Sequence, residues 1–184
     1  TLRNFIKIAD TAGVLRKYNL KRKEFCLLTL HRPSNVDERS VLEKIAKVIK
    51  KISGSTKVFF PVHPRTALKI KEFRLGKYFS PPGVLMTEPI RYIGTIALMA
   101  SAKLVITDSG GLQEETTYLR VPCLTLRENT ERPVTITEGT NTVVGTNTAF
   151  LLKKFNEILS GQYKKGTLPE YWDGKTAQRI TKIL

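Results

Sequence analysis

The sequence has few cysteines and no long apolar run, and each shortage excludes a class of protein. The two cysteines, Cys26 and Cys123, each lie inside an apolar strand-like segment of the 184 residues. That setting suits small buried hydrophobic residues better than a disulfide framework or a metal site. No apolar stretch approaches the ~20 residues that a membrane-spanning helix needs, and none has the basic start and apolar centre of a signal peptide. We therefore expect a cytoplasmic protein that binds no metal and does not associate with membranes.

Acidic residues are also scarce, and this leaves a large positive charge. Against 16 Asp and Glu there are 31 Lys and Arg, which gives a formal net charge of +15. Such a charge favours nucleic acids, anionic membranes or phosphorylated small molecules as partners. Many basic residues recur at helical spacing, as in 44–51 and 69–77, which is typical of solvated helix faces. Because the sequence has no zinc-finger or helix-turn-helix spacing, nucleic-acid binding is only a minor hypothesis.

Strand-like and helix-like segments alternate along the chain. Continuous apolar segments predict strands, and apolar residues with a period of 3.6 predict helices. We expect strands over 25–30, 57–62, 84–86, 104–107, 121–126 and 142–144. We expect helices over 38–52, 67–75, 93–100 and 147–159, and another that follows 104–107 and ends near Leu119. Alternation of this kind predicts an α/β fold with a parallel sheet covered by helices on both faces.

The N-terminal segment indicates that the sequence is a fragment. Residues 2–20 carry apolar side chains at roughly helical spacing, a basic segment follows over 21–23, and no initiator Met precedes them. We interpret residues 1–22 as a linking helix at the start of a fragment of a longer protein. The rest of the chain, 23–184, is long enough for one well-packed domain.

Residues 104–117 have the pattern of an anion site. The predicted strand leads into Gly110 and Gly111, which let the backbone turn sharply before the next helix. The free N–H groups and the dipole at the start of such a helix favour a phosphate. Glu114 and Glu115 lie one turn further on, where their carboxylates could accept hydrogen bonds from sugar hydroxyls. An ordinary helix cap with glutamates that compensate the dipole explains the pattern equally well.

Polar loops follow other predicted strands at the same edge of the sheet, where parallel sheets bind their ligands. His31 and Arg32 supply an imidazole and a cation directly after the first strand. The alternative is a loop histidine bonded to a neighbouring carbonyl. His63 repeats the arrangement, although Pro64 favours a conformational role for that loop. The polar segment 127–133 is either a cluster of surface ion pairs or a set of side chains that orient a ligand.

Seven motifs, taken in order, give a more specific interpretation. They cover residues 29–35, 61–66, 88–92, 107–115, 127–133, 139–141 and 172–174. In this order they resemble the C-terminal half of the UDP-N-acetylglucosamine 2-epimerase family, and the resemblance runs over nearly the whole chain. It implies two Rossmann-like domains that face each other across a cleft, as in the glycosyltransferases called GT-B. Residues 23–184 then resemble the second, three-layer α/β/α, UDP-binding domain, with a final helix over 169–184 that packs back towards the missing partner.

The resemblance also implies roles for individual residues. The family inverts C2 of UDP-N-acetylglucosamine by eliminating UDP to form a glycal and adding it back, and it needs no cofactor. The residues that would bind the substrate are Ser109, Gly110, Gly111, Glu115, Arg132, Ile90 and Thr95. The segment 109–111 would hold the diphosphate, Glu115 the ribose, and Arg132 the phosphate and sugar side. His31 is the catalytic candidate, and Arg32 and His63 match a second, regulatory nucleotide-sugar site.

The function that follows is that of a UDP-N-acetylglucosamine 2-epimerase of cell-surface polysaccharide biosynthesis, a homodimer when full-length. The groups that move the C2 proton would lie in the missing domain, so the fragment alone would bind UDP and turn nothing over. Two alternatives are a GT-B glycosyltransferase, which transfers the sugar to an acceptor, and a basic nucleic-acid-binding module. The sequence does not distinguish between two products, which are UDP-N-acetylmannosamine and free N-acetylmannosamine with UDP.

Overall fold

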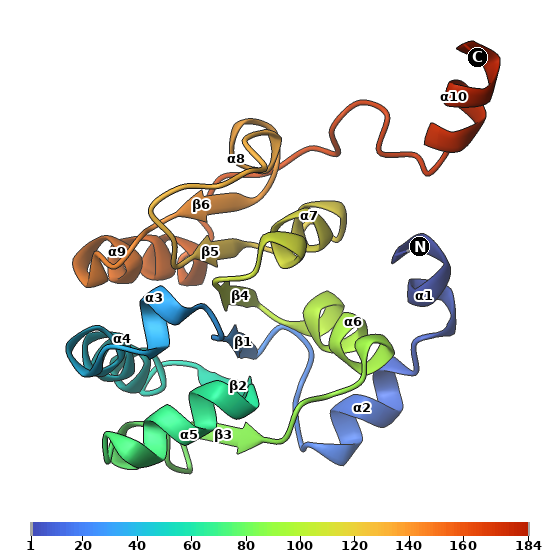
Figure 1. Ribbon diagram of the computed structural model, residues 1–184. Helices are drawn as coiled ribbons and strands as arrows, with labels where there is room; N and C mark the ends of the chain where they lie inside the picture. The colour runs from blue at the N-terminus through green and yellow to red at the C-terminus, as the bar shows by residue number, and fades with distance from the viewer. Residues whose placement is uncertain (1, 184) are drawn as a thin grey trace.

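A six-stranded parallel sheet lies between helical layers in the computed structural model, which describes residues 2–183 (Figure 1). The strands are β1 (Phe25–Thr29), β2 (Lys57–Pro61), β3 (Val84–Thr87), β4 (Leu104–Thr107), β5 (Cys123–Thr125) and β6 (Asn141–Val143). Their order is β3-β2-β1-β4-β5-β6, and every neighbouring pair is parallel. The predicted α/β fold with a parallel sheet is confirmed. The strand order reverses between β1 and β4, which is where open parallel sheets bind ligands.

Helices cover both faces of the sheet because alternate strand residues point to opposite sides. Leu28 and Phe60 belong to one buried core, and Leu27 and Phe59 belong to the other. The first core is covered by α4 (Arg39–Ile52), α5 (Pro64–Glu72) and α9 (Thr148–Leu159). The second is covered by α1 (Leu2–Ile8), α2 (Thr11–Lys17), α6 (Tyr92–Ser101) and α7 (Gly110–Tyr118). Figure 1 shows the two helical layers on either side of the strands.

Three short elements were not predicted, and α5 begins and ends at other residues than expected. The short ones are α3 (Pro33–Val36), the 3₁₀ helix η1 (Gly76–Tyr78) and α8 (Val134–Thr137). The helix expected over 67–75 starts earlier, because Pro64 occupies its first turn and His63 Nδ1 accepts a hydrogen bond from the Arg65 N–H at 3.2 Å. It ends at Glu72, and Arg74 has a φ of 57°, which a continuing helix does not allow.

Both ends of the chain differ from the expected single helices. Residues 2–20 form two helices, because the Asp10 carboxylate accepts a hydrogen bond from the Gly13 N–H at 2.8 Å and starts α2 anew. The expected helix 169–184 is shortened to α10 (Thr176–Ile183), which follows a turn at Gly174 with a φ of 81°. Residues 1 and 184 of these predicted segments lie outside the described part. The boundaries 1–22 and 23–184 stay predictions.

The expected burial of the cysteines agrees with the structure. Cys26 and Cys123 are free thiols, and both are fully buried in strands. Burial raises the pKa of the Cys123 thiol to about 11, so it is uncharged at neutral pH. None of the helices within residues 2–183 has the length and apolarity that a membrane crossing requires.

Candidate functional site at the switch point of the sheet

The loops that follow β1 and β4 meet at the switch point of the sheet. Thr29 of β1 pairs in register with Thr107 of β4, and their hydroxyl oxygens lie 2.6 Å apart. The chain therefore leaves the sheet at the same level on both strands. His31 follows one strand and Ser109 follows the other, so the structure brings these two predicted site residues to the same edge.

Asp108 links the two loops from a fully buried position. One carboxylate oxygen, Oδ1, lies 2.9 Å from His31 Nδ1, and the other, Oδ2, accepts hydrogen bonds from the backbone N–H groups of His31 (3.0 Å) and Arg32 (2.9 Å). Asn35 Nδ2 donates to Oδ2 at 3.1 Å. Burial raises the pKa of Asp108, but these hydrogen bonds outweigh burial and hold the pKa below its usual value. Asp108 is therefore a buried, ionised carboxylate.

The start of α7 has the properties of an open anion site. Ser109 is its N-cap residue, yet the Ser109 side chain makes no capping hydrogen bond, so the ordinary cap interpretation is not supported. A Cβ added at Gly111 would meet nothing within 4 Å, and one at Gly110 would meet only the tips of Arg127 and Glu131, at 3.8 and 3.9 Å. These glycines thus leave the sides of the first helical turn uncrowded, where the N–H groups have no partner within the helix and favour an anion.

Two arginines near this helix start are paired with carboxylates. Arg127 donates two hydrogen bonds to Glu131, at 2.7 and 2.5 Å. This contact lowers the pKa of Glu131 to about 2. Arg132 Nε lies 2.9 Å from Glu114 Oε1. Of the two interpretations of segment 127–133, the structure therefore supports the ion pairs.

Glu115 is partly buried on α7 and is held by Tyr92 of α6. The Tyr92 hydroxyl donates to Glu115 Oε1 at 2.6 Å, and the Tyr92 ring packs edge-on against Phe5 with centroids 5.2 Å apart. Burial raises the pKa of Glu115, the Tyr92 hydrogen bond lowers it and Glu114 raises it, so that the pKa lies above its usual value. Glu114 and Glu115 line a hollow of about 290 Å³ together with Trp172. Sequence reasoning missed Tyr92 as a partner of Glu115.

Four of the remaining predicted residues line a second, smaller hollow, and Arg32 is not among its lining residues. His31, His63, Ile90 and Thr95 line a space of about 160 Å³. The rings of His31 and His63 lie 5.9 Å apart. Thr95 uses its hydroxyl to donate to the Ile90 carbonyl oxygen at 3.3 Å. His31 is thus the predicted residue that stands between this hollow and the start of α7.

A buried polar network that sequence reasoning also missed supports the start of α7. Gln113 Oε1 accepts hydrogen bonds from Thr130 Oγ1 (2.5 Å) and Asn141 Nδ2 (3.1 Å), and Gln113 Nε2 donates to the Ser109 carbonyl oxygen at 3.2 Å. Asn141 also bonds Thr125 of β5. The network connects α7 to β5, β6 and segment 127–133. A polar residue in the first turns of a helix after a buried strand is the signal that could have found it.

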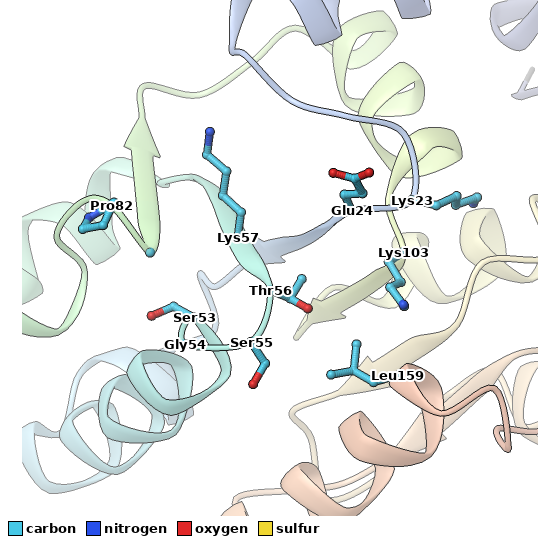
Figure 2. Close-up of a pocket in the computed structure, with 11 residues that line it drawn as sticks. Lys23, Glu24, Ser53, Gly54, Ser55, Thr56, Lys57, Pro82, Lys103 and Leu159 are labelled. Carbon is cyan, nitrogen blue, oxygen red and sulfur yellow. The ribbon is translucent and has the colours of Figure 1, made fainter.

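A further hollow lies at the other edge of the sheet and is not part of this site. It measures about 770 Å³ and includes Lys57, the first residue of β2. Lys57 donates to the Asn19 carbonyl oxygen at 3.1 Å, and Lys23 donates to that of Ala102 at 2.9 Å. Figure 2 shows the amino groups of Lys57 and Lys103 pointing apart. Lys57 and Lys23 thus donate to backbone carbonyls, and Lys103 points away from Lys57. Within residues 2–183, no group of three or more His, Cys, Asp or Glu is arranged to hold a metal ion.

Comparisons with known proteins agree with this arrangement. A family model described as UDP-N-acetylglucosamine 2-epimerase matches residues 2–184. The UDP-N-acetylglucosamine 2-epimerases of Methanocaldococcus jannaschii and Methanococcus maripaludis are 40% and 38% identical to this chain. The matches cover 88% and 100% of this chain, but 44% and 51% of those proteins. The chain therefore spans about half the length of these relatives.

Solved structures share the fold. The crystal structure of the M. jannaschii UDP-GlcNAc 2-epimerase in complex with UDP-GlcNAc and UDP has a TM-score of 0.85 and 38% identity, and the match covers 99% of this chain and 51% of that one. The Neisseria meningitidis enzyme bound to UDP-GlcNAc has a TM-score of 0.82 at 23% identity, which shows the fold alone, and the match covers 99% of this chain and 52% of that one. With its parallel sheet, its open helix start at the switch point and a family match over its length, the chain belongs to the UDP-N-acetylglucosamine 2-epimerase family.

Proposed function

We propose that this chain is the UDP-binding half of an enzyme that inverts C2 of UDP-N-acetylglucosamine. The open start of α7 is the observation that carries the proposal. A Cβ at Gly111 would meet nothing within 4 Å, two arginines lie near this helix start, and His31 follows β1 at the same edge of the sheet. The first N–H groups of a helix have no partner within the helix. The M. jannaschii relative, solved with UDP-GlcNAc and UDP, supports the same ligand class.

The proposed pose follows the edge of the sheet. Ser109, Gly110 and Gly111 hold the diphosphate at the helix start, and Arg132 leaves Glu114 to contact it. Glu115, held by Tyr92, accepts hydrogen bonds from the ribose hydroxyls. The UDP leaving group gains negative charge when the C1–O bond breaks, so donors and cations fixed at the diphosphate lower the barrier.

The base and the sugar are assigned to residues at the second hollow. Ile90 and Thr95 contact the uracil from the hollow that they line, and His31 faces the sugar. Arg32 and His63 belong to a regulatory nucleotide-sugar site that is completed by the other half of the protein. These assignments rest on the family resemblance of the motifs that contain them.

The rest of the chemistry belongs to an N-terminal half. Removing the C2 proton and returning it on the opposite face require general acid and base groups on both faces of the sugar. The exposed apolar residues Ile8 on α1 and Ile180 and Ile183 on α10 support a partner domain on that side of the molecule. We propose a cytoplasmic, homodimeric full-length enzyme of cell-surface polysaccharide biosynthesis, and a chain that binds UDP but turns nothing over by itself.

Calorimetry with UDP tests the binding site. We expect the parent chain to bind UDP, and Glu115→Ala and Arg132→Ala to bind it more weakly. Glu24→Ala and Arg22→Ala are matched controls, because both residues precede β1 at the opposite edge of the sheet and are exposed. No binding by the parent, or equal binding by all variants, contradicts the site.

A product assay separates the proposed reaction from glycosyl transfer. The full-length protein is incubated with UDP-N-acetylglucosamine and no acceptor. An epimerase forms N-acetylmannosamine products under these conditions, whereas a glycosyltransferase has no acceptor to use. Absence of any such product contradicts the proposed reaction.

A further inference from the structure

We propose that Asp108 is a positioning residue that fixes both the ring orientation and the tautomer of His31. The proposal deepens the proposed function and rests on it for the role of His31 towards the sugar. It concerns a residue that directly follows β4 and precedes the anion site at the start of α7.

Three contacts to Asp108 fix the whole of His31. The backbone N–H groups of His31 and Arg32 donate to Oδ2 at 3.0 and 2.9 Å, which fixes the main chain. The ring nitrogen Nδ1 lies 2.9 Å from Oδ1, which fixes the side chain. Hydrogen bonds to an ionised acceptor are about twice as strong as neutral ones. One buried carboxylate therefore determines where the imidazole points.

The carboxylate is itself prevented from turning. Asn35 is buried and donates one amide hydrogen to Asp108 Oδ2 at 3.1 Å and the other to the Leu126 carbonyl oxygen at 2.8 Å. Leu126 directly follows β5, so Asn35 ties the carboxylate to the loops after three strands. The orientation of Asp108 is thus set by the sheet rather than by a mobile side chain.

The ring contact distinguishes this role from that of a simple link between loops. Two backbone hydrogen bonds would suffice to join the β1 and β4 loops. The His31 side chain is instead 40% exposed, whereas that of Asp108 is 0% exposed. The Nδ1 edge of the ring is therefore held by the buried carboxylate, and the opposite edge of the ring faces the site. When Nδ1 carries the proton that Asp108 accepts, the neutral imidazole presents Nε2 as an acceptor. Nε2 is then the atom that accepts a hydrogen bond from the sugar.

Nitrogen-15 NMR of the imidazole rings reads the tautomer directly. The chain has only two histidines, so the spectrum of a His63→Gln variant assigns the signals of His31. In its neutral form, we expect the His31 ring of the parent to carry its proton on Nδ1. In Asp108→Asn the amide can donate to Nδ1, and we expect the ratio of the two tautomers to shift towards Nε2–H by about tenfold or more.

Asp37→Asn is the matched control, because Asp37 lies on the same connection between β1 and α4 but bonds Arg65 instead of His31. We expect it to leave the tautomer of His31 unchanged. An Nε2–H tautomer in the parent overturns the proposal, even if Asp108→Asn does not fold. A folded Asp108→Asn variant with the parent's tautomer overturns it as well. UDP calorimetry on the parent is independent of this readout, so a failure of the proposed function is recognised separately.

Discussion

Replacing Gln113 by leucine is expected to destabilise the chain and to loosen the polar segment 127–133. Gln113 is fully buried on α7 and makes three hydrogen bonds through its side chain. Leucine fills a similar volume, so the packing changes little while all three hydrogen bonds are lost. The variant therefore isolates the contribution of the polar network.

The expected loss of stability follows from the partners that remain. Each intramolecular hydrogen bond contributes about 0.5–1.5 kcal/mol net. Asn141 retains its hydrogen bonds to Thr125 (2.6 Å) and Thr135 (3.1 Å), so its polar atoms are not left without partners. We expect a decrease in the free energy of unfolding of about 2–4 kcal/mol. For a chain of this length, each kcal/mol lowers Tm by roughly 2–4 °C.

Urea unfolding followed by circular dichroism measures this change. Gln162→Leu is the matched control, because Gln162 is exposed and surface substitutions usually stay within about 0.5 kcal/mol. A loss below about 1 kcal/mol for Gln113→Leu would refute the reasoning, since it would mean that Thr130 and Ser109 find equivalent partners elsewhere. Under the proposed function, Gln113→Leu also weakens UDP binding, because the Ser109 carbonyl and Thr130 lose their common anchor.

Two further predictions concern carboxylates at the site. Glu115→Gln is expected to stabilise the free chain at neutral pH, because burial raises the pKa of Glu115 above its usual 4.5 and disfavours the charged form in the folded state. The gain should appear as the pH rises through the folded-state pKa and vanish below about pH 4, where both states are protonated, and urea unfolding at the two pH values checks it. Glu131→Gln is expected to strengthen UDP binding in calorimetry, because it frees Arg127. Glu128→Gln is the control, because it removes the same charge from the same loop while Glu128 bonds Thr146 and not Arg127. An equal gain in UDP affinity in both variants would contradict a specific effect.

The sheet could be predicted from the sequence because strands buried on both faces are continuous apolar segments. The ends of the helices depended on single residues. The helix expected from residue 67 onward begins at Pro64, since apolar spacing ignores a proline and a capping His63 that need no apolar face. The helix expected over residues 2–20 breaks at Asp10 for the same reason.

The position of the candidate site could also be predicted, but its pairings could not. Loops after strands of a parallel sheet gather at one edge whatever the strand order. Which side chains meet there depends on the pairing of β1 with β4, and no local pattern encodes that pairing. Asp108 therefore looked like part of a turn, although it is the buried partner of His31. The pairing of Arg132 with Glu114 likewise depends on how segment 127–133 folds over α7.

The strand order has a consequence for how the site is assembled as the chain folds. Strands β1, β2 and β3 are consecutive in the chain and adjacent in the sheet, and so are β4, β5 and β6. The two triplets join at β1 and β4, where His31 and Asp108 are 77 positions apart. Closing so long a loop is entropically unfavourable and slow compared with local pairing. Two triplets that have folded separately contain no site, so the appearance of ligand affinity during refolding would mark the moment at which they join.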